Sequence, residues 1–85
     1  MQIIYTSKFE REYRKLSTEI RLVAKRKEKI FRTNKFHPSL ETHKLSGKFR
    51  DFWAFSIDRK NRIIFEFGDN DIIFFHSVGD HDIYR

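Results

Sequence analysis

The chain has 85 residues, a formal net charge of +6 and no cysteine, and its aromatic residues are 10 Phe, 1 Trp and 3 Tyr. This length predicts one domain, residues 1–85, with a single core built largely from those rings. The lack of cysteine excludes a disulfide framework, a cysteine-bound zinc site and a thiol nucleophile. No signal sequence and no apolar run of roughly 18 residues is present, so we expect a cytoplasmic protein that does not enter a membrane.

The positive charge is unevenly distributed along the chain. Residues 1–36 hold 11 Lys and Arg against 4 Asp and Glu, whereas residues 37–85 hold 7 against 8. Such a field attracts polyanions, either nucleic acid or an acidic protein partner. A solvated helix face without a dedicated partner is the alternative interpretation.

The N-terminal part predicts a short strand over residues 2–5 and then a helix. We expect Ser7 to cap this helix, with Glu10 completing a capping box. Apolar residues recur at helical spacing along one face of it. These residues are Phe9, Tyr13 and Leu16.

A second helix is expected to begin near Ser17 or Thr18 and to run to about Lys35, pairing with the first as an antiparallel hairpin. Pro38 ends this region, and residues 37–48 are interpreted as a loop that leads into a sheet. One apolar stripe, interrupted by Lys27, follows the second helix. It consists of Ile20, Val23, Ala24, Ile30 and Phe31.

After Phe49 the hydrophobic period changes from helical to alternating, which predicts three successive strands. Short turns at residues 58–61 and 68–70 require antiparallel hairpins. The expected fold class is therefore α+β in the order β-α-α-β-β-β, with two N-terminal helices packed on a small, mainly antiparallel twisted sheet. The predicted strand faces are Trp53, Phe55 and Ile57; Ile63, Phe65 and Phe67; and Ile72, Phe74, His76 and Val78 or their alternates.

Three residues of this second half carry groups suited to acid–base chemistry or anion binding. Arg62 should lie beside the small Ala54 and Ser56 on the sheet face away from the core. His43 and His81 lie in predicted loops. For each of these three residues taken alone, an ordinary surface side chain is the alternative interpretation. The histidine spacing does not predict a metal site, and no phosphate-binding glycine loop or serine nucleophile motif is present.

The ordered series Leu45-Ser46-Gly47, Trp53, Arg62-Ile63-Ile64-Phe65 and Val78-Gly79-x-His81 resembles the RelE/ParE superfamily of toxins from bacterial type II toxin–antitoxin systems. The resemblance covers the whole chain in element order and is closest to the RelE, YoeB and YafQ-like ribonucleases. It implies a metal-independent endoribonuclease without cofactors, which cleaves mRNA in the ribosomal A site.

By this resemblance His43 matches the position of a catalytic histidine in YafQ-like toxins and a glutamate in YoeB-like ones. Arg62 matches an arginine that RelE and YoeB-like members carry. His81 matches a basic residue that follows the Val-Gly turn in other members, and Tyr84 resembles the family's C-terminal aromatic residue. Trp53 and Phe55 replace lysines of RelE, which implies a histidine-based site. Neutral His43 would deprotonate a ribose 2′-hydroxyl, and protonated His81 would give a proton to the leaving 5′-oxygen. Arg62 would stabilise the transition state, and Tyr84 would stack on a base.

The resemblance also implies partners. These are a cognate antitoxin in a hetero-oligomer, mRNA and the ribosome, and basic side chains would contact the RNA. Two alternatives remain open from the sequence. ParE-like relatives share the fold and poison DNA gyrase, and a non-catalytic nucleic-acid-binding or antitoxin-binding module is also consistent with it. The residues expected to contact RNA are Arg21, Lys25, Lys29, Arg32, Lys44 and Lys48.

Overall fold

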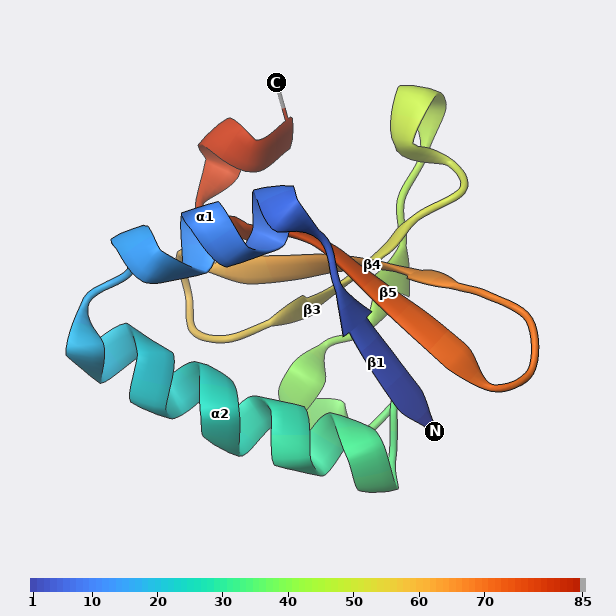
Figure 1. Cartoon of the computed structure of the whole chain (residues 1–85), viewed down its shortest axis with the longest axis horizontal. Helices are drawn as coiled ribbons and strands as arrows, with labels where there is room; N and C mark the ends of the chain where they lie inside the picture. The colour runs from blue at the N-terminus through green and yellow to red at the C-terminus, as the bar shows by residue number, and fades with distance from the viewer. Residues whose placement is uncertain (85) are drawn as a thin grey trace.

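The computed structural model describes residues 1–84 and consists of two helices and a five-stranded sheet (Figure 1). The strand order is β1-β5-β4-β3-β2; β1 runs parallel to β5, and the other neighbours are antiparallel. The predicted α+β class and the antiparallel hairpins are confirmed. The elements are β1 (Gln2–Tyr5), α1 (Ser7–Lys15), α2 (Thr18–Thr33), β2 (His43–Lys44), β3 (Trp53–Ser56), β4 (Arg62–Phe67) and β5 (Ile72–Gly79), with short 3-10 turns η1 (Pro38–Leu40), η2 (Gly47–Phe49) and η3 (His81–Tyr84).

The predicted boundaries of the helices were partly wrong. Thr6, not Ser7, caps α1, because its hydroxyl accepts a hydrogen bond from the N–H of Phe9 at 3.1 Å. A capping box from Glu10 is thereby ruled out, since that residue lies one position too far from Thr6. Ser17 caps α2 as expected. This helix ends at Thr33 rather than Lys35, because the Asn34 side chain accepts from the following backbone and stops the helix.

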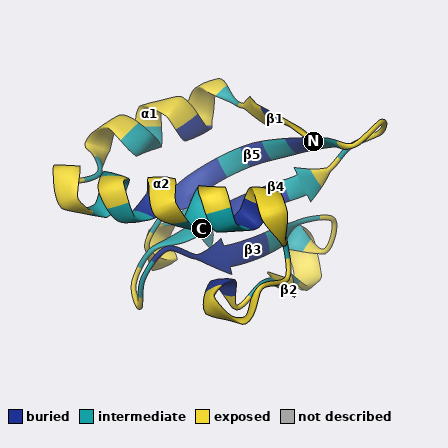
Figure 2. Cartoon of the chain, turned by 90° about the horizontal axis from the view of Figure 1, so that it is seen from below, coloured by how far each residue is buried: buried dark blue, intermediate teal, exposed yellow. Residues whose placement is uncertain are grey.

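The core lies between α2 and the sheet, where the buried residues of both face each other (Figure 2). Phe31 of α2 is at its centre. Its ring is fully buried and lies 4.7, 4.9 and 5.6 Å, between centroids, from Phe55, Phe65 and Phe75. The predicted apolar stripe of α2 is confirmed, and Lys27, which interrupts it, turns outward and donates to the carbonyl of Ser39. One sheet face is therefore covered by α2 through aromatic contacts.

A bulge in β5 changes which of its residues face the core. Ile64 pairs with Ser77 but Phe65 pairs with Phe75, so His76 is an extra residue in β5. Before the bulge, the alternates of the predicted set, Ile73 and Phe75, face the core; after it, Val78 does. Strict alternation fails at this point because one added residue reverses the direction of every later side chain.

The loop predicted over residues 37–48 contains a fifth strand that the sequence pattern did not reveal. His43 and Lys44 form β2 and pair with Ala54 and Trp53 at the edge of the sheet. Two residues are too few to show an alternating pattern. This strand matters because it attaches a predicted site residue, His43, to the sheet.

Helix α1 covers the edge of β5 where the shorter β1 has ended. The Glu12 carboxylate accepts hydrogen bonds from the Ser77 hydroxyl at 2.7 Å and from the Val78 N–H at 3.1 Å, and Lys8 also donates to the Ser77 hydroxyl. A side chain thus satisfies a backbone N–H that would otherwise be exposed at a strand edge. These bonds fix α1 against the part of β5 that holds the bulge.

Candidate functional site

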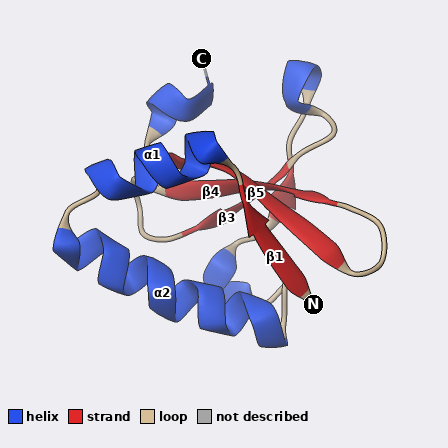
Figure 3. Ribbon diagram, in the orientation of Figure 1, coloured by secondary structure: helices blue, strands red, loops and turns tan. Residues whose placement is uncertain are grey.

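The sheet face turned away from α2 carries most of the predicted site residues, and we call it the open face. Figure 3 shows η2 and η3 on the side of the sheet opposite to α2. The cross-strand register places His43 with Ala54, Ala54 with Ile64, and Ser56 with Arg62 on this face. Its residues are His43, Ala54, Ser56, Arg62, Ile64, Glu66, Phe74, His76 and Ser77.

His43 lies at the β2 edge of the open face, with an exposed side chain. Its Nδ1 is 3.0 Å from the carbonyl oxygen of Glu41. A carbonyl oxygen only accepts hydrogen bonds, so Nδ1 carries the proton and Nε2 of the neutral ring keeps its lone pair. The Glu41 carboxylate in turn accepts from Ser56, the cross-strand neighbour of Arg62. The ring is thus oriented with a basic nitrogen available.

Arg62 is anchored to the β3–β4 turn. Its Nη1 donates to the carbonyl oxygens of Asp58 at 2.8 Å, Asn61 at 3.2 Å and Arg59 at 3.4 Å. The expected position beside Ala54 and Ser56 is confirmed by the register. All three bonds use Nη1, so this arginine has a structural role in the turn in addition to any role of its Nη2 edge.

The same turn holds Asp58 in its ionised form. Partial burial opposes ionisation, but hydrogen bonds from the N–H groups of Asn61 and Lys60, and the charge of Arg62, outweigh it and lower the pKa of Asp58 below its ordinary value. A carboxylate whose folded-state pKa is lowered stabilises the protein above the unfolded-state pKa, and this contribution disappears as the pH falls through the folded-state pKa.

We therefore expect Asp58→Asn to lower the free energy of unfolding at neutral pH by about 1 kcal/mol, the scale of a charged hydrogen bond lost to a neutral one. The difference from the wild type should shrink as the pH falls below about 4, the unfolded-state pKa of aspartate, and vanish once the pH is below the lowered folded-state pKa of Asp58. Urea unfolding across this pH range measures it. Asp51→Asn, at an exposed position outside the turn, is the control, and an equal loss in both variants would contradict the role of Asp58.

His81 and Tyr84 lie on η3, which folds back toward the open face. The Tyr84 ring is 6.0 Å from Phe49 of η2 and 6.4 Å from the His81 ring. Gly79 permits this return, since a Cβ there would lie only 2.7 Å from Ile83. Beneath the two turns is a pocket of about 250 Å³. Its lining residues are Thr6, Lys8, Phe49, Phe52, Ile64, His76, Ser77 and Ile83.

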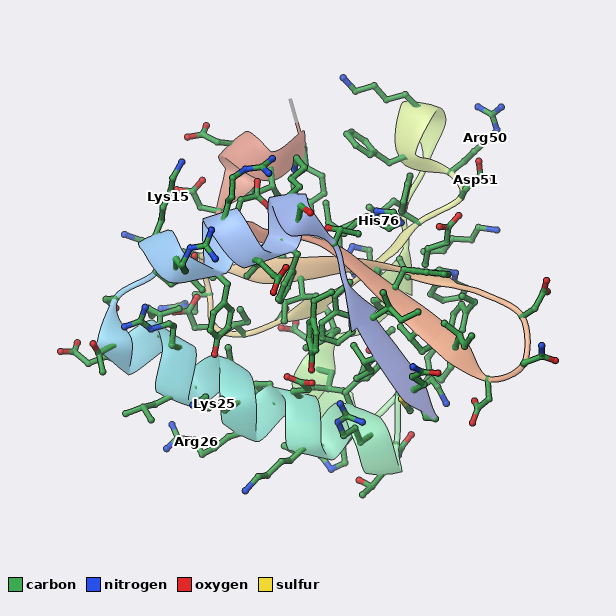
Figure 4. All side chains as sticks on the ribbon, in the orientation of Figure 1. Lys15, Lys25, Arg26, Arg50, Asp51 and His76 are labelled. Atoms are coloured by element: carbon green, nitrogen blue, oxygen red, sulfur yellow. The ribbon has the colours of Figure 1, made fainter. Side chains whose placement is uncertain are left out.

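The residue that sequence reasoning missed is His76. The β5 bulge directs it onto the open face (Figure 4), where its Nε2 lies 3.0 Å from the Glu66 carboxylate and its ring stands edge-on to Phe52 at 4.8 Å. Both partners of this pair are about one-third exposed, His76 at 34% and Glu66 at 38%. The sequence does show an acid, Glu66, and a histidine, His76, on the two sides of the β4–β5 hairpin. Their contact could not be inferred, because it depends on the bulge, which has no sequence pattern.

The four predicted catalytic residues do not form one contact set. His81 and Tyr84 are neighbours, and Arg62 pairs with Gly79, two residues before His81. His43, however, lies on β2, three strand spacings from β5, which is about 14 Å. His76 lies on β5 as well, so the same three strand spacings separate its backbone from that of His43.

The predicted RNA-contacting residues differ in their availability. On α2, Arg32 binds Glu28 at 3.2 Å, and Arg21 donates to the Arg14 carbonyl and the Thr18 hydroxyl. Lys25 and Lys29 are exposed, and Lys25 lines the groove between α1 and α2 together with Tyr13 and Arg14. Lys44 and Lys48 are also exposed, and the Lys48 ammonium lies 5.3 Å from the centre of the Phe49 ring.

Within residues 1–84, no group of three or more His, Asp or Glu side chains is arranged to hold a metal ion. No helix in this range has the length and apolar character needed to cross a membrane.

Similarity to known proteins lies in the fold rather than in the sequence. No protein-family model matches the chain, and no curated protein matches its sequence. Among solved structures, YafQ from Escherichia coli BL21(DE3) superposes with a TM-score of 0.81 over 98% of this chain and 96% of its own, at 13% identity. The chain has the YafQ toxin fold. The YoeB/ParE toxin from Agrobacterium tumefaciens gives a TM-score of 0.80 over 95% and 99% of the two chains, also at 13% identity.

The YafQ fold is also matched in a complex. The E. coli DinJ–YafQ complex superposes with a TM-score of 0.68 at 16% identity, over 96% of this chain and 94% of that one. At such identities the likeness establishes the YafQ fold and leaves the activity to be argued from this chain's own side chains.

Proposed function

We propose that this chain is the toxin of a toxin–antitoxin pair and that it acts as an endoribonuclease. The observation that carries the proposal is the composition of the open face. His43, Arg62 and His76 lie on this face, and His76 and Lys8 line a pocket with aromatic walls there, on a fold shared with toxins. General acid–base groups, an anion-stabilising cation and stacking rings are what RNA cleavage by transesterification requires.

The reaction uses the substrate's own nucleophile. Neutral His43 accepts the proton of a ribose 2′-hydroxyl through Nε2, and the resulting alkoxide attacks the adjacent phosphate in line. Arg62 stabilises the charge that develops on the phosphate oxygens. Protonated His81 supplies the proton to the departing 5′-oxygen, while Tyr84 stacks on a base.

His76 enters the proposal as a second candidate for the proton donor. Its Nε2 lies 3.0 Å from the Glu66 carboxylate, which can accept a hydrogen bond from Nε2–H and so orients the ring on the open face. It lies on the open face beside Phe52, which comes directly before β3, whereas His81 lies on η3, after the end of β5.

We also propose mRNA in the ribosomal A site as the substrate and a cognate antitoxin as the partner that silences the toxin. The basic surface of α2 supports the first, because ribosomal RNA is a dense polyanion. The DinJ–YafQ complex supports the second, since that toxin of the same fold is bound by an antitoxin.

The test is to express the chain from a tightly repressed promoter and map RNA 5′ ends in arrested cells. We expect new ends within mRNA and none at positions where a synthetic reporter RNA carries a single 2′-deoxyribose, since the nucleophile is absent there. Arrested cells with intact RNA would exclude the ribonuclease. Intact RNA with DNA gyrase inhibited in a supercoiling assay would identify the ParE-like alternative.

Reversing two exposed charges of α2, by Lys25→Glu with Lys29→Glu, should weaken ribosome binding and flatten its salt dependence. The physical reason is that each lost phosphate contact lowers the slope of log affinity against log salt by roughly one. Sedimentation with ribosomes over a salt series measures this. Lys15→Glu with Lys60→Glu, two exposed lysines outside α2, is the control of equal charge change. Equal slopes for both double variants would show that α2 is a solvated face.

A further inference from the structure

A row of aromatic rings lies on the α2 side of the sheet, outside the open face. Phe36 contacts Trp53 and Trp53 contacts Phe67, each pair with centroids 5.6 Å apart and ring planes nearly perpendicular, at 76° and 87°. Phe36 is 56% exposed and Phe67 41% exposed. We call these three residues the aromatic row. It follows the end of α2 at Thr33, next to the buried rings that Phe31 covers.

The exposure of the aromatic row is not explained by folding. A phenylalanine that leaves more than half of its surface in water contributes little apolar burial. Contiguous exposed rings mark binding surfaces more often than isolated apolar residues do. Phe36 also sits in the segment after α2, where a polar residue would satisfy the local backbone equally well.

Positive charge lies at one end of the aromatic row. Lys44 pairs with Trp53 across β2 and β3, so its exposed side chain lies on the same face as the indole. At the other end, the acidic residues Asp69 and Asp71 follow Phe67, and Asp71 is paired with the N-terminal ammonium at 2.9 Å. A ligand with flat apolar groups and negative charge fits the Lys44 end.

We infer that the aromatic row is a base-stacking platform for single-stranded RNA, with Lys44 bound to a phosphate. The inference rests on the proposed function for the kind of ligand, but not on any catalytic residue. Exposed rings stack on nucleobases irrespective of sequence, and a neighbouring lysine neutralises the backbone. A second copy of the chain fits less well, because a stable dimer buries about 800 Å² on each partner and three partly exposed rings offer much less.

The position of β2 connects this platform to the open face. His43 points to the open face and the next residue, Lys44, to the opposite face, because neighbouring strand residues alternate. An RNA strand that leaves His43 needs only to cross this edge strand to reach Trp53. The platform therefore holds nucleotides that flank the cleaved phosphate.

Trp53 is the only tryptophan of the chain, so its fluorescence reports on the platform directly. We would titrate the protein with a fully 2′-O-methylated single-stranded RNA, which lacks the 2′-hydroxyl nucleophile, and follow Trp53 emission alongside the anisotropy of a dye on the RNA. Binding should quench Trp53. Phe36→Ala and Phe67→Ala should each weaken binding roughly 5- to 100-fold, and Lys44→Gln should lower the salt slope by about one.

Leu22→Ala is the matched control, since Leu22 is an apolar side chain 55% exposed on α2, and it should bind like the wild type. RNA binding without a change in Trp53 emission would overturn the inference, as would Trp53 emission that changes with protein concentration alone, which indicates a second copy. Cleavage of unmodified mRNA is assayed separately, with ribosomes present. Cleavage without quenching refutes the platform and leaves the ribonuclease standing, whereas quenching without cleavage supports the platform and refutes the ribonuclease.

Discussion

RNA cleavage by the purified protein should fall about 100- to 10,000-fold in His43→Gln, the range measured for loss of a general acid or base. A comparable fall is expected in either His81→Gln or His76→Gln, depending on which ring protonates the leaving oxygen. The fold should survive all three substitutions, because each of these side chains is at least one-third exposed and outside the core. Initial rates on mRNA bound to ribosomes, with far-UV circular dichroism of the purified variants as the fold check, provide the measurement.

The chain has four histidines, and the fourth supplies the control. His37 lies before η1, outside the sheet, where its Nδ1 accepts from the Ser39 N–H. Asparagine caps such turns as well, so His37→Asn should cleave like the wild type. Wild-type rates in His43→Gln would remove that residue from the mechanism. If His76→Gln loses activity and His81→Gln retains it, the proton donor lies on the bulge rather than on η3.

Phe31→Ala should leave little folded protein at 37 °C. Truncating a buried phenylalanine costs about 3 to 5 kcal/mol, while a whole domain is stable by only about 5 to 15 kcal/mol, with small domains at the lower end. The cost should be near the upper limit here, because the Phe31 ring contacts Phe55, Phe65 and Phe75 at once. Urea unfolding followed by circular dichroism gives the value.

Phe36→Ala removes the same number of atoms from a ring that is 56% exposed, and it is the control for this substitution. We expect it to cost less than about 1 kcal/mol. Equal losses in the two variants would mean that α2 is not held to the sheet mainly through Phe31. The same Phe36 variant then serves for the RNA titration, because it stays folded.

Element types were predictable from the sequence wherever the signal was local. The stripe ending in Phe31 marks α2, since residues three and four apart share a helix face. The turn at residues 58–61 is too short for anything but an antiparallel hairpin, and the structure has one there. The register of that hairpin followed as well, with Arg62 opposite Ser56.

The site was less predictable because its geometry depends on residues distant in sequence. His43 was expected in a loop, yet it belongs to a strand whose two residues pair with β3. Arg62 was expected either to contact substrate or to be an ordinary surface arginine, and the structure shows its Nη1 bonded to three carbonyls of the neighbouring turn. Neither contact has a sequence pattern, because each depends on how far one backbone segment approaches another.

By itself the sequence determined one α+β domain, the order of its helices and hairpins, the rings of its core and its basic N-terminal part. The hydrophobic period, the turn length and the charge are properties of residues close together in the sequence, so they can be recognised without knowing the fold. Only the tertiary structure decided that a one-residue bulge brings His76 to Glu66 and that Lys44 stands beside Trp53. These placements depend on strand register, and register is set by packing across the whole sheet.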